Sequence, residues 1–172
     1  MADRHLVISK KRLQETVCAL GAQISADYAG KELVMVGVLN GAFIFLADLV
    51  RTVTIPHQID FIRVASYGHS DASSGTIRMA KDIELDIRDK HVLLVEDIVD
   101  TGTTLAWLSE RFKGKQATSV RICALIDKKE RRQTEVQLDY VGFAQDGFLV
   151  GYGLDFAEQY RYLPEIYSLS FP

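Results

Sequence analysis

The first third of the chain alternates between helix-like and strand-like apolar patterns. From residue 11 to residue 28 the apolar positions recur every three or four residues and fall on one helical stripe, at Leu13, Val17, Leu20, Ile24 and Tyr28. Residues 32–39, ELVMVGVL, form a short run that is almost continuously apolar, which is typical of a strand buried on both faces. Asn40-Gly41 breaks this run, and residues 42–51 then predict a helix.

The same alternation continues along the middle of the chain. Residues 59–66 and the segment HVLLVED predict strands, TLAWLSERFKG predicts a helix, and residues 119–127 predict another strand. YVGF and FLVGYGL add two shorter strands around the turn-forming QDG. Strands that alternate with helices favour an α/β fold, so we expect a single domain over residues 1–172 with a mostly parallel central sheet flanked by helices.

Residues 67–81, YGHSDASSGTIRMAK, fit neither pattern. They combine Gly, Ser, Asp and Thr with little periodicity, and they are longer than the usual connection inside a compact domain. Connections of this length are usually lids, binding loops or disordered segments. The sequence therefore predicts a flexible lid or the tip of a hairpin, and it leaves these two alternatives open.

Composition narrows the class of protein. The chain has 172 residues, 48% of them hydrophobic and 25% charged, which suits one packed core, and its formal net charge of -3 is unlike that of a nucleic-acid binder. Cys18 and Cys123 stand among apolar neighbours and predict reduced, buried thiols. We find no apolar run of membrane-spanning length and no signal-peptide pattern in MADRHLVISKKR, and expect a cytoplasmic protein without nucleic-acid or membrane partners.

Candidate chemistry is concentrated in residues 92–105, VLLVEDIVDTGTTL. If residues 92–95 form the buried strand, Glu96 and Asp97 emerge at its end, Asp100 lies in the following loop, and residues 101–104, TGTT, lead into the helix. Ligands of parallel sheets bind beyond the carboxyl ends of strands. The unpaired N–H groups of a helix start attract anions, and glycine and threonine allow close approach and further donors, so TGTT predicts a phosphate site.

The acids beside this phosphate site require a different partner. Adjacent carboxylates can accept hydrogen bonds from a vicinal diol, and carboxylate oxygens are ligands that Mg²⁺ takes while it also binds substrate phosphates. The predicted ligand thus carries a phosphate, a ribose diol and a metal-bound anion. A helix cap beside a solvated acidic loop explains fewer of these residues together. A P-loop ATPase would need the motif GxxxxGK[ST], which is absent from the sequence.

The stretch VLLVEDIVDTGTTL resembles the phosphoribosyl-pyrophosphate signature of type I phosphoribosyltransferases, most closely that of the hypoxanthine-guanine phosphoribosyltransferases. The resemblance extends over nearly the whole chain through VGVLNGAFIF, SYGHSDASSGTIR, LIDKKERR, DYVGF, FLVGYGLDF and YRYLPEIYSLS. It implies the type I phosphoribosyltransferase fold, with a flexible lid at about residues 67–81 and a small base-binding hood at about residues 128–172. It also implies transfer of the 5-phosphoribosyl group from phosphoribosyl pyrophosphate to N9 of hypoxanthine or guanine in purine salvage, which gives IMP or GMP plus pyrophosphate, with Mg²⁺ as cofactor.

The resemblance also implies sites for individual residues. The ribose hydroxyls would be held by Glu96 and Asp97, and Asp100 would share a proton with N7 of the base. The 5-phosphate site would comprise Asp100, Thr101, Gly102, Thr103 and Thr104; the pyrophosphate site Asn40, Gly41, Ser66, Tyr67 and Arg161; the purine site Lys128, Phe148, Leu149 and Asp155; and the metal ligands Glu96, Asp97 and Asp155.

Within the implied purine site, Lys128 would donate to O6, Phe148 would stack on the ring and Leu149 would offer its backbone carbonyl. Taken singly, Lys128 and Arg161 are typical of surface charges and Phe148 is typical of a core residue. The resemblance therefore carries these assignments.

At Asn40 the chain departs from the family pattern, which often has a basic residue there, and we expect weaker donor binding in consequence. The sequence leaves open whether the loop Leu39-Asn40-Gly41 keeps the cis peptide that the family can have. The resemblance further implies a homodimer or homotetramer. Two other classes stay open: a nucleotide-sensing regulator without turnover, which the retention of Asp100 disfavours, and an acidic-pocket signalling receiver, which does not explain TGTT.

Overall fold

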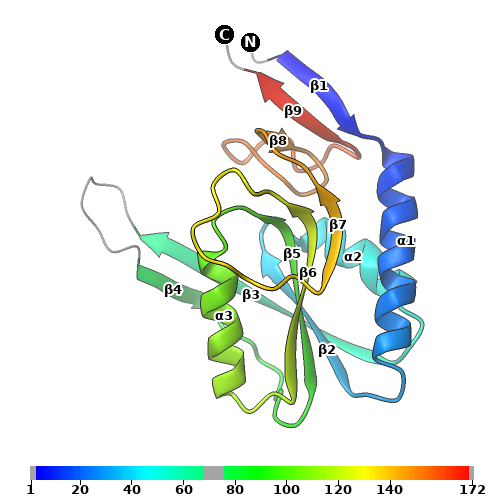
Figure 1. Cartoon of the computed structure of the whole chain (residues 1–172), viewed down its shortest axis with the longest axis vertical. Helices are drawn as coiled ribbons and strands as arrows, with labels where there is room; N and C mark the ends of the chain where they lie inside the picture. The colour runs from blue at the N-terminus through cyan, green and yellow to red at the C-terminus, as the bar shows by residue number, and fades with distance from the viewer. Residues whose placement is uncertain (1–2, 68–75, 171–172) are drawn as a thin grey trace.

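The structure, a computed structural model, describes residues 3–67 and 76–170, which form two sheets and three helices (Figure 1). In chain order the elements are β1 (Asp3–Ile8), α1 (Lys10–Asp27), β2 (Leu33–Leu39), α2 (Phe43–Thr52), β3 (His57–Tyr67), β4 (Thr76–Lys81), β5 (His91–Val99), α3 (Thr103–Gly114), β6 (Ser119–Asp127), β7 (Tyr140–Ala144), β8 (Leu149–Val150) and β9 (Ile166–Ser170). None of the helices in this part of the chain has the length and apolar content needed to cross a membrane.

The larger sheet has six strands in the order β4-β3-β2-β5-β6-β7. All neighbouring strands run parallel except the edge pair β3 and β4, which is antiparallel. Leu33 lies opposite His91, and His91 lies opposite Ser119, so the central strands are in step and their carboxyl ends meet at one edge of the sheet. The predicted α/β fold with a mostly parallel central sheet is confirmed.

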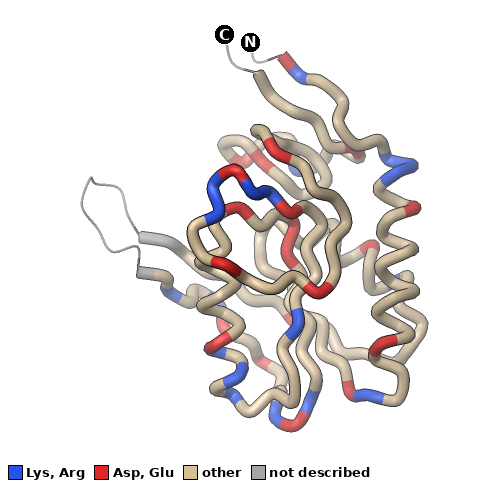
Figure 2. The backbone as a smooth tube through the Cα atoms, viewed as in Figure 1, with Lys and Arg blue, Asp and Glu red and all other residues tan. Residues whose placement is uncertain are grey.

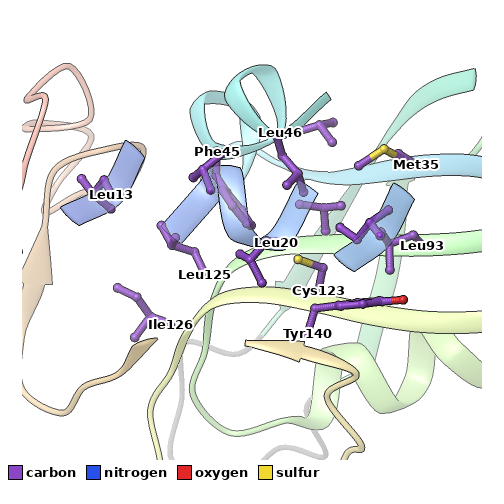
Figure 3. Close-up of a cluster of buried hydrophobic side chains, with 14 of the residues drawn as sticks. Leu13, Leu20, Met35, Phe45, Leu46, Leu93, Cys123, Leu125, Ile126 and Tyr140 are labelled. Atoms are coloured by element: carbon purple, nitrogen blue, oxygen red, sulfur yellow. The ribbon is translucent and has the colours of Figure 1, made fainter. Parts of the chain in front are cut away.

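Helices cover both faces of this sheet, α1 and α2 on one face and α3 on the other (Figure 1). Side chains alternate between the two faces of a strand, so Leu93 of β5 packs with the first pair of helices and Leu94 packs with α3. The predicted stripe of α1 is buried throughout, at Leu13, Val17, Leu20, Ile24 and Tyr28. Figure 3 shows part of this core, where Leu20, Phe45 and Cys123 lie between helices and sheet.

The two cysteines differ from each other in a way that the sequence did not predict. Cys123 is fully buried on β6, as expected, but Cys18 is exposed on α1. Cys18 follows Val17 directly, and successive residues of a helix are rotated by about 100° around its axis, so Cys18 faces away from the buried stripe. The prediction of a buried thiol was therefore wrong for Cys18.

A second sheet with the order β1-β9-β8 forms the upper part of the molecule and contains both ends of the described chain (Figure 1). Strands β8 and β9 lie within the segment expected to form the base-binding hood, and we call this sheet the hood; that it binds the base stays a prediction. Neither β1 nor β9 carries a strand-like pattern of apolar residues. The segment between β8 and β9 contains Tyr152, whose hydroxyl donates to Asp48 of α2 at 2.6 Å. The hood is thus fixed against the layer of helices.

Two boundaries differ from expectation. Strand β5 continues to Val99, two residues beyond the predicted HVLLVED, because Ile98 and Val99 still pair with Ile126 and Asp127 of β6, so the two acids lie within the strand and not at its end. Residues 76–81 of the segment that fitted no pattern form β4. The rest of that segment, residues 68–75, lies outside the described residues, and the choice between lid and hairpin tip stays a prediction.

Asp60 of β3 fixes the chain that follows β4. It is 8% exposed, and its carboxylate accepts hydrogen bonds from the N–H groups of Phe61, Glu84 and Leu85. Burial by itself would raise the pKa of Asp60, but these hydrogen bonds and the charge of Lys81 outweigh burial and lower the pKa. A lowered pKa means that the ionised carboxylate stabilises the folded state.

We therefore expect Asp60→Asn to lower the free energy of unfolding at neutral pH by about 1–3 kcal/mol. This loss should shrink as the pH falls below about 4, the ordinary pKa of an aspartate, because the wild-type carboxylate then becomes protonated as well. Urea unfolding at a series of pH values measures it, and Asp86→Asn, which changes an exposed acid nearby, serves as control. A loss that is the same at every pH would contradict this origin of the stabilisation.

Candidate active site

A cavity of about 320 Å³ lies at the carboxyl end of the parallel strands. It is bounded by the ends of β2 and β5, by β3 and β4, and by the first turn of α3. Its lining contains the predicted site residues Gly41, Glu96, Asp100, Thr101, Gly102 and Thr104. The structure thus brings the acids Glu96 and Asp100, the TGTT segment and the loop after β2 to the same cavity.

The turn into α3 presents its backbone to this cavity. Gly102 precedes the helix with φ of 81°, in the left-handed region that glycine adopts most easily. A β-carbon at this position would lie 2.2 Å from the carbonyl oxygen of Thr134, so the turn also needs glycine for lack of space. The N–H groups of Gln133 and Thr134 donate to the carbonyl of Thr101 at 2.9 and 3.0 Å. Residues 133 and 134 therefore hold this turn in place, and the N-terminus of α3 is directed at the cavity.

Glu96 and Asp97 are crowded acids. Burial, and after it the charge of Asp97, raise the pKa of Glu96 well above its ordinary value. Burial also raises the pKa of Asp97, although the N–H of Ile98, which donates at 2.9 Å, and the charge of Arg161 oppose this effect. Two such groups favour a partner that brings positive charge or hydroxyl donors.

The two carboxylate oxygens of Asp100 differ in their contacts. Its Oδ2 lies 3.4 Å from Nη1 of Arg131, an exposed side chain. Its Oδ1 is buried and has no hydrogen-bond partner among the described residues. A buried oxygen without a donor is costly unless a ligand supplies one, so this atom is suited to a polar hydrogen of a bound molecule.

Two of the residues predicted for the pyrophosphate site, Asn40 and Arg161, come from separate loops and meet at one hollow. The peptide bond between Leu39 and Asn40 is cis, which answers the question that the sequence left open. Asn40 and Arg161 border a second hollow of about 480 Å³. Arg161 donates through Nη1 to the carbonyl of Gly153 at 2.7 Å, while its Nε is buried without a partner in the described part of the chain. Ser66 and Tyr67 are the last two residues of β3.

Gly41 allows the loop after β2 to reach the acids. A β-carbon at Gly41 would lie 2.0 Å from Oδ2 of Asp97. The loop backbone and this carboxylate are therefore in direct contact, which links the predicted pyrophosphate and ribose sites.

The residues predicted for the purine site do not line the 320 Å³ cavity. The side chain of Lys128 is 11% exposed, and its Nζ lies 3.6 Å from Glu130. Phe148 is 43% exposed and makes an edge contact with Phe156, with ring centroids 5.4 Å apart. Leu149 is buried in β8. Lys128 and Phe148 come from one region, because Asp146 accepts hydrogen bonds from the N–H groups of residues 129 and 130.

Asp155 is engaged with neighbours of its own loop. Its Oδ1 pairs with Nη2 of Arg161 at 2.9 Å, and its Oδ2 accepts from the N–H of Glu158 at 2.9 Å. Within residues 3–67 and 76–170, no three His, Cys, Asp or Glu side chains converge on a common point that could hold a metal ion. Glu96 and Asp97 can still fit Mg²⁺, because this ion commonly takes one or two carboxylates and completes its shell with substrate oxygens and water.

Several residues around the site carry no assignment from the sequence, among them Ile98, Arg131 and Arg132. Ile98 lines the cavity between Glu96 and Asp100, and an apolar residue at this position in the sequence gives no indication of a binding role. Arg131 contacts Asp100, and Arg132 contacts the backbone of the same loop. Both arginines belong to KKERR, a run that is typical of a solvated surface, so charge pattern alone provides no signal for them.

Comparison with known proteins agrees with this geometry. Residues 9–157 match the family described as Phosphoribosyl transferase domain. The chain is 44% identical to the hypoxanthine-guanine phosphoribosyltransferase of Streptococcus pneumoniae, covering 95% of this chain and 91% of that protein. It is 42% identical to the hypoxanthine phosphoribosyltransferase of Salmonella typhimurium, covering 94% and 92%.

Solved structures agree as well. The crystal structure of a hypoxanthine phosphoribosyltransferase from Staphylococcus aureus superposes with a TM-score of 0.92 at 39% identity, over 96% of this chain and 91% of that chain. Sequence, fold and the position of the acidic turn point the same way: the chain belongs to the phosphoribosyltransferase family and, within it, to the hypoxanthine-guanine phosphoribosyltransferases.

Proposed function

We propose that this enzyme transfers the 5-phosphoribosyl group of phosphoribosyl pyrophosphate to N9 of hypoxanthine or guanine in purine salvage. The observation that carries this proposal is the cavity at the end of β5, where Glu96, Asp100 and the start of α3 meet. The hollow has acids on one side and unpaired helix N–H groups on the other, which suits a molecule with a diol and a phosphate at its two ends. Phosphoribosyl pyrophosphate is such a molecule.

The 5-phosphate would lie on residues 100–104, where the backbone N–H groups and threonine hydroxyls are donors. Glu96 and Asp97 would accept hydrogen bonds from the ribose hydroxyls. Asn40, Gly41, Ser66, Tyr67 and Arg161 would contact pyrophosphate. The buried, unpartnered Nε of Arg161 supports this placement, because an anion would supply the acceptor that it lacks among the described residues.

In the reaction, N9 of the purine forms a bond to C1 of the ribose while the bond from C1 to the pyrophosphate oxygen breaks. Positive charge grows on the ribose and negative charge on the leaving group. Glu96 and Asp97 would stabilise the ribose side, and Arg161 would stabilise pyrophosphate. The proton on N7 of the base passes to Asp100, whose Oδ1 has no competing donor among the described residues.

Mg²⁺, when bound, would supply positive charge to the leaving pyrophosphate. Glu96 and Asp97 are the residues that would hold it, directly or through water, and its charge would oppose the effects of burial and of Asp97, which together raise the pKa of Glu96. Asp155 would contribute a ligand after release from its present partners, Arg161 and the N–H of Glu158.

The purine would be bound by Lys128, Phe148 and Leu149. Lys128 would exchange its contact with Glu130 for O6 of the base, and Phe148, which is 43% exposed, offers a ring face for stacking. Leu149 would contribute its backbone carbonyl to the edge of the base. These contacts suit 6-oxopurines as a class.

The direct test is product formation. Purified enzyme mixed with hypoxanthine, phosphoribosyl pyrophosphate and Mg²⁺ is expected to give IMP and pyrophosphate, measured by chromatography, and guanine is expected to give GMP. Hypoxanthine, guanine and xanthine in parallel assays establish the order of preference. Absence of product with all three bases would reject the proposed function.

A basic residue at position 40 should strengthen donor binding. We expect Asn40→Lys to lower the KM for phosphoribosyl pyrophosphate roughly threefold to tenfold, because a cation would then face the pyrophosphate beside Arg161. Steady-state kinetics at saturating hypoxanthine measures the change, which salt should weaken. Thr54→Lys adds the same charge at an exposed position past the far end of α2 and is the control. An unchanged or higher KM would refute the expectation.

We also propose a cytoplasmic homo-oligomer, a dimer or a tetramer. Apolar side chains on the surface support association, among them Phe43 and Ile59, each 43% exposed. Light scattering coupled to size exclusion measures the molar mass in solution.

A further inference from the structure

The loop between β6 and β7 contacts the phosphate turn, residues 100–104, through residues 133 and 134, and it carries both basic and acidic residues (Figure 2). Nothing in the proposed mechanism uses Arg132, which belongs to this loop. Its side chain is only 12% exposed, which is unusual for an arginine and requires acceptors for its N–H groups. The structure supplies them from two different strands.

Arg132 contacts the ends of both β5 and β6. Its Nε donates to the carbonyl of Asp100 at 3.0 Å, and its Nη2 lies 3.3 Å from the carbonyl of Val99. The same Nη2 donates to the carboxylate of Asp127 and to the carbonyl of Lys128 at 3.2 Å. Asp127 is itself only 12% exposed, so the pair is enclosed and little screened by solvent.

The two residues proposed to contact N7 and O6 of the purine directly follow these two strand ends. Asp100 follows β5 and would take the proton of N7, while Lys128 follows β6 and would donate to O6. The two strands are also joined directly, since the N–H of Lys128 donates to the carbonyl of Val99 at 3.0 Å. N7 and O6 lie on the same edge of a rigid ring system, so the separation between their two partners must be held constant.

We propose that Arg132 is a positioning residue that sets the distance between Asp100 and Lys128. It would thereby fix the orientation of the purine for transfer. This inference rests on the proposed function. Arg132 touches the backbone of both residues and neither substrate. Its planar guanidinium can direct several N–H groups at separate acceptors, which the single ammonium of a lysine cannot reproduce.

The phosphate half of the site is held by different bonds. The carbonyl of Thr101 accepts from the backbone N–H groups of Gln133 and Thr134, and Gly102 packs against the carbonyl of Thr134. Arg132 also approaches this turn, since its Cδ would lie 3.1 Å from a β-carbon at Gly102, but its hydrogen bonds go to Val99, Asp100, Asp127 and Lys128, and lysine keeps a methylene group at the Cδ position. A change confined to that side chain should therefore disturb purine binding and transfer much more than binding of the phosphoribosyl donor.

Arg132→Lys is the decisive variant, because it keeps the positive charge beside Asp127. We expect kcat/KM for hypoxanthine to fall about 100-fold, as a displacement near 1 Å of reacting groups typically causes, while the KM for phosphoribosyl pyrophosphate changes less than about threefold. Arg132→Met should give the same split with a larger loss. If Arg132→Met does not fold, Arg132→Lys still decides the question.

A second readout is independent of turnover. Calorimetry with IMP and with ribose 5-phosphate separates the purine contribution to binding from that of the phosphate and diol. Arg132→Lys is expected to weaken IMP binding about tenfold or more and to leave ribose 5-phosphate binding nearly unchanged. Equal weakening of both ligands would overturn the inference, because it would mean that the phosphate turn has collapsed.

Arg121→Lys is the matched control. Arg121 lies toward the other end of β6 and also pairs with an acid, at 3.5 Å from Asp27, but it is remote from the site. We expect this variant to keep wild-type kinetics. Wild-type kinetics in Arg132→Lys would overturn the inference while leaving the proposed function intact, whereas failure of the wild-type enzyme to form IMP would reject the proposed function itself.

Discussion

Asp100→Asn is expected to lower kcat for hypoxanthine by about 10²- to 10⁴-fold, the usual contribution of a positioned acid or base. An amide cannot take up the N7 proton, so the bond to N9 would form without transfer of that proton. The folded state should change little, because the carboxylate has only an exposed arginine, Arg131, at 3.4 Å and an Oδ1 without a partner in the described part of the chain. Steady-state and single-turnover kinetics measure the loss.

The comparison must separate chemistry from binding. The KM for phosphoribosyl pyrophosphate should stay within a few-fold of wild type, because the backbone of residues 100–104 still faces the phosphate. Asp86→Asn, a change of the same kind at an exposed acid, should leave both constants unaltered. If the asparagine variant turned over at the wild-type rate, Asp100 would have no part in proton transfer.

Gly102→Ala has the second largest expected effect. The added methyl group would meet the carbonyl oxygen of Thr134 at 2.2 Å, and φ of 81° is itself unfavourable for alanine. We expect a loss of at least about 1–3 kcal/mol in the free energy of unfolding and a KM for phosphoribosyl pyrophosphate raised by about tenfold or more, since the turn must move away from the phosphate. Thermal unfolding and donor titrations measure these two quantities.

Helix α3 offers its own control at the opposite end. Gly114 is the last residue of α3, and a methyl group added there would meet no neighbouring atom within 4 Å in the described part of the chain. Gly114→Ala should therefore be neutral or should stabilise the helix by up to about 1 kcal/mol. A neutral or stabilising effect of Gly102→Ala, like that expected for Gly114→Ala, would show that the closeness of Thr134 does not govern the result.

The parts of the fold that were predictable are those held by local pattern. The stripe of α1 and the apolar run of β2 specify a helix and a buried strand by themselves, and the structure confirms both. The predicted strand HVLLVED stops two residues before β5 ends, because the acids Glu96 and Asp97 look like the start of a loop. Only the pairing with β6 reveals that the strand continues.

The hood illustrates what sequence pattern does not reveal. Strand β1 pairs with β9, so Asp3 lies opposite Ser170 at the far end of the chain. Most of β1 is exposed, and it therefore lacks the alternation that would mark a strand with one buried face. Such a strand is defined by its distant partner, which one sequence without known contacts does not specify.

In the site, the phosphate turn could be predicted from the chemistry of its residues, whereas the purine residues could be predicted only from the family resemblance. TGTT after a buried strand already predicts anion binding. Lys128, in contrast, stands in a run of charges, and nothing local distinguishes it from Lys129. The partners of Arg132 come from residues 99–100 and 127–128, and they could be recognised only when these segments were seen side by side.

The contrast between the two thiols has a practical consequence. Burial raises the pKa of Cys123 and encloses its sulfur between sheet and helices, so a maleimide reagent should not reach it in the folded protein. Cys18 is exposed on α1, away from the cavity at the end of β5. Without any substitution the chain therefore offers a single attachment point for a fluorophore or a surface linker, and uptake of a second label would report that the core has opened.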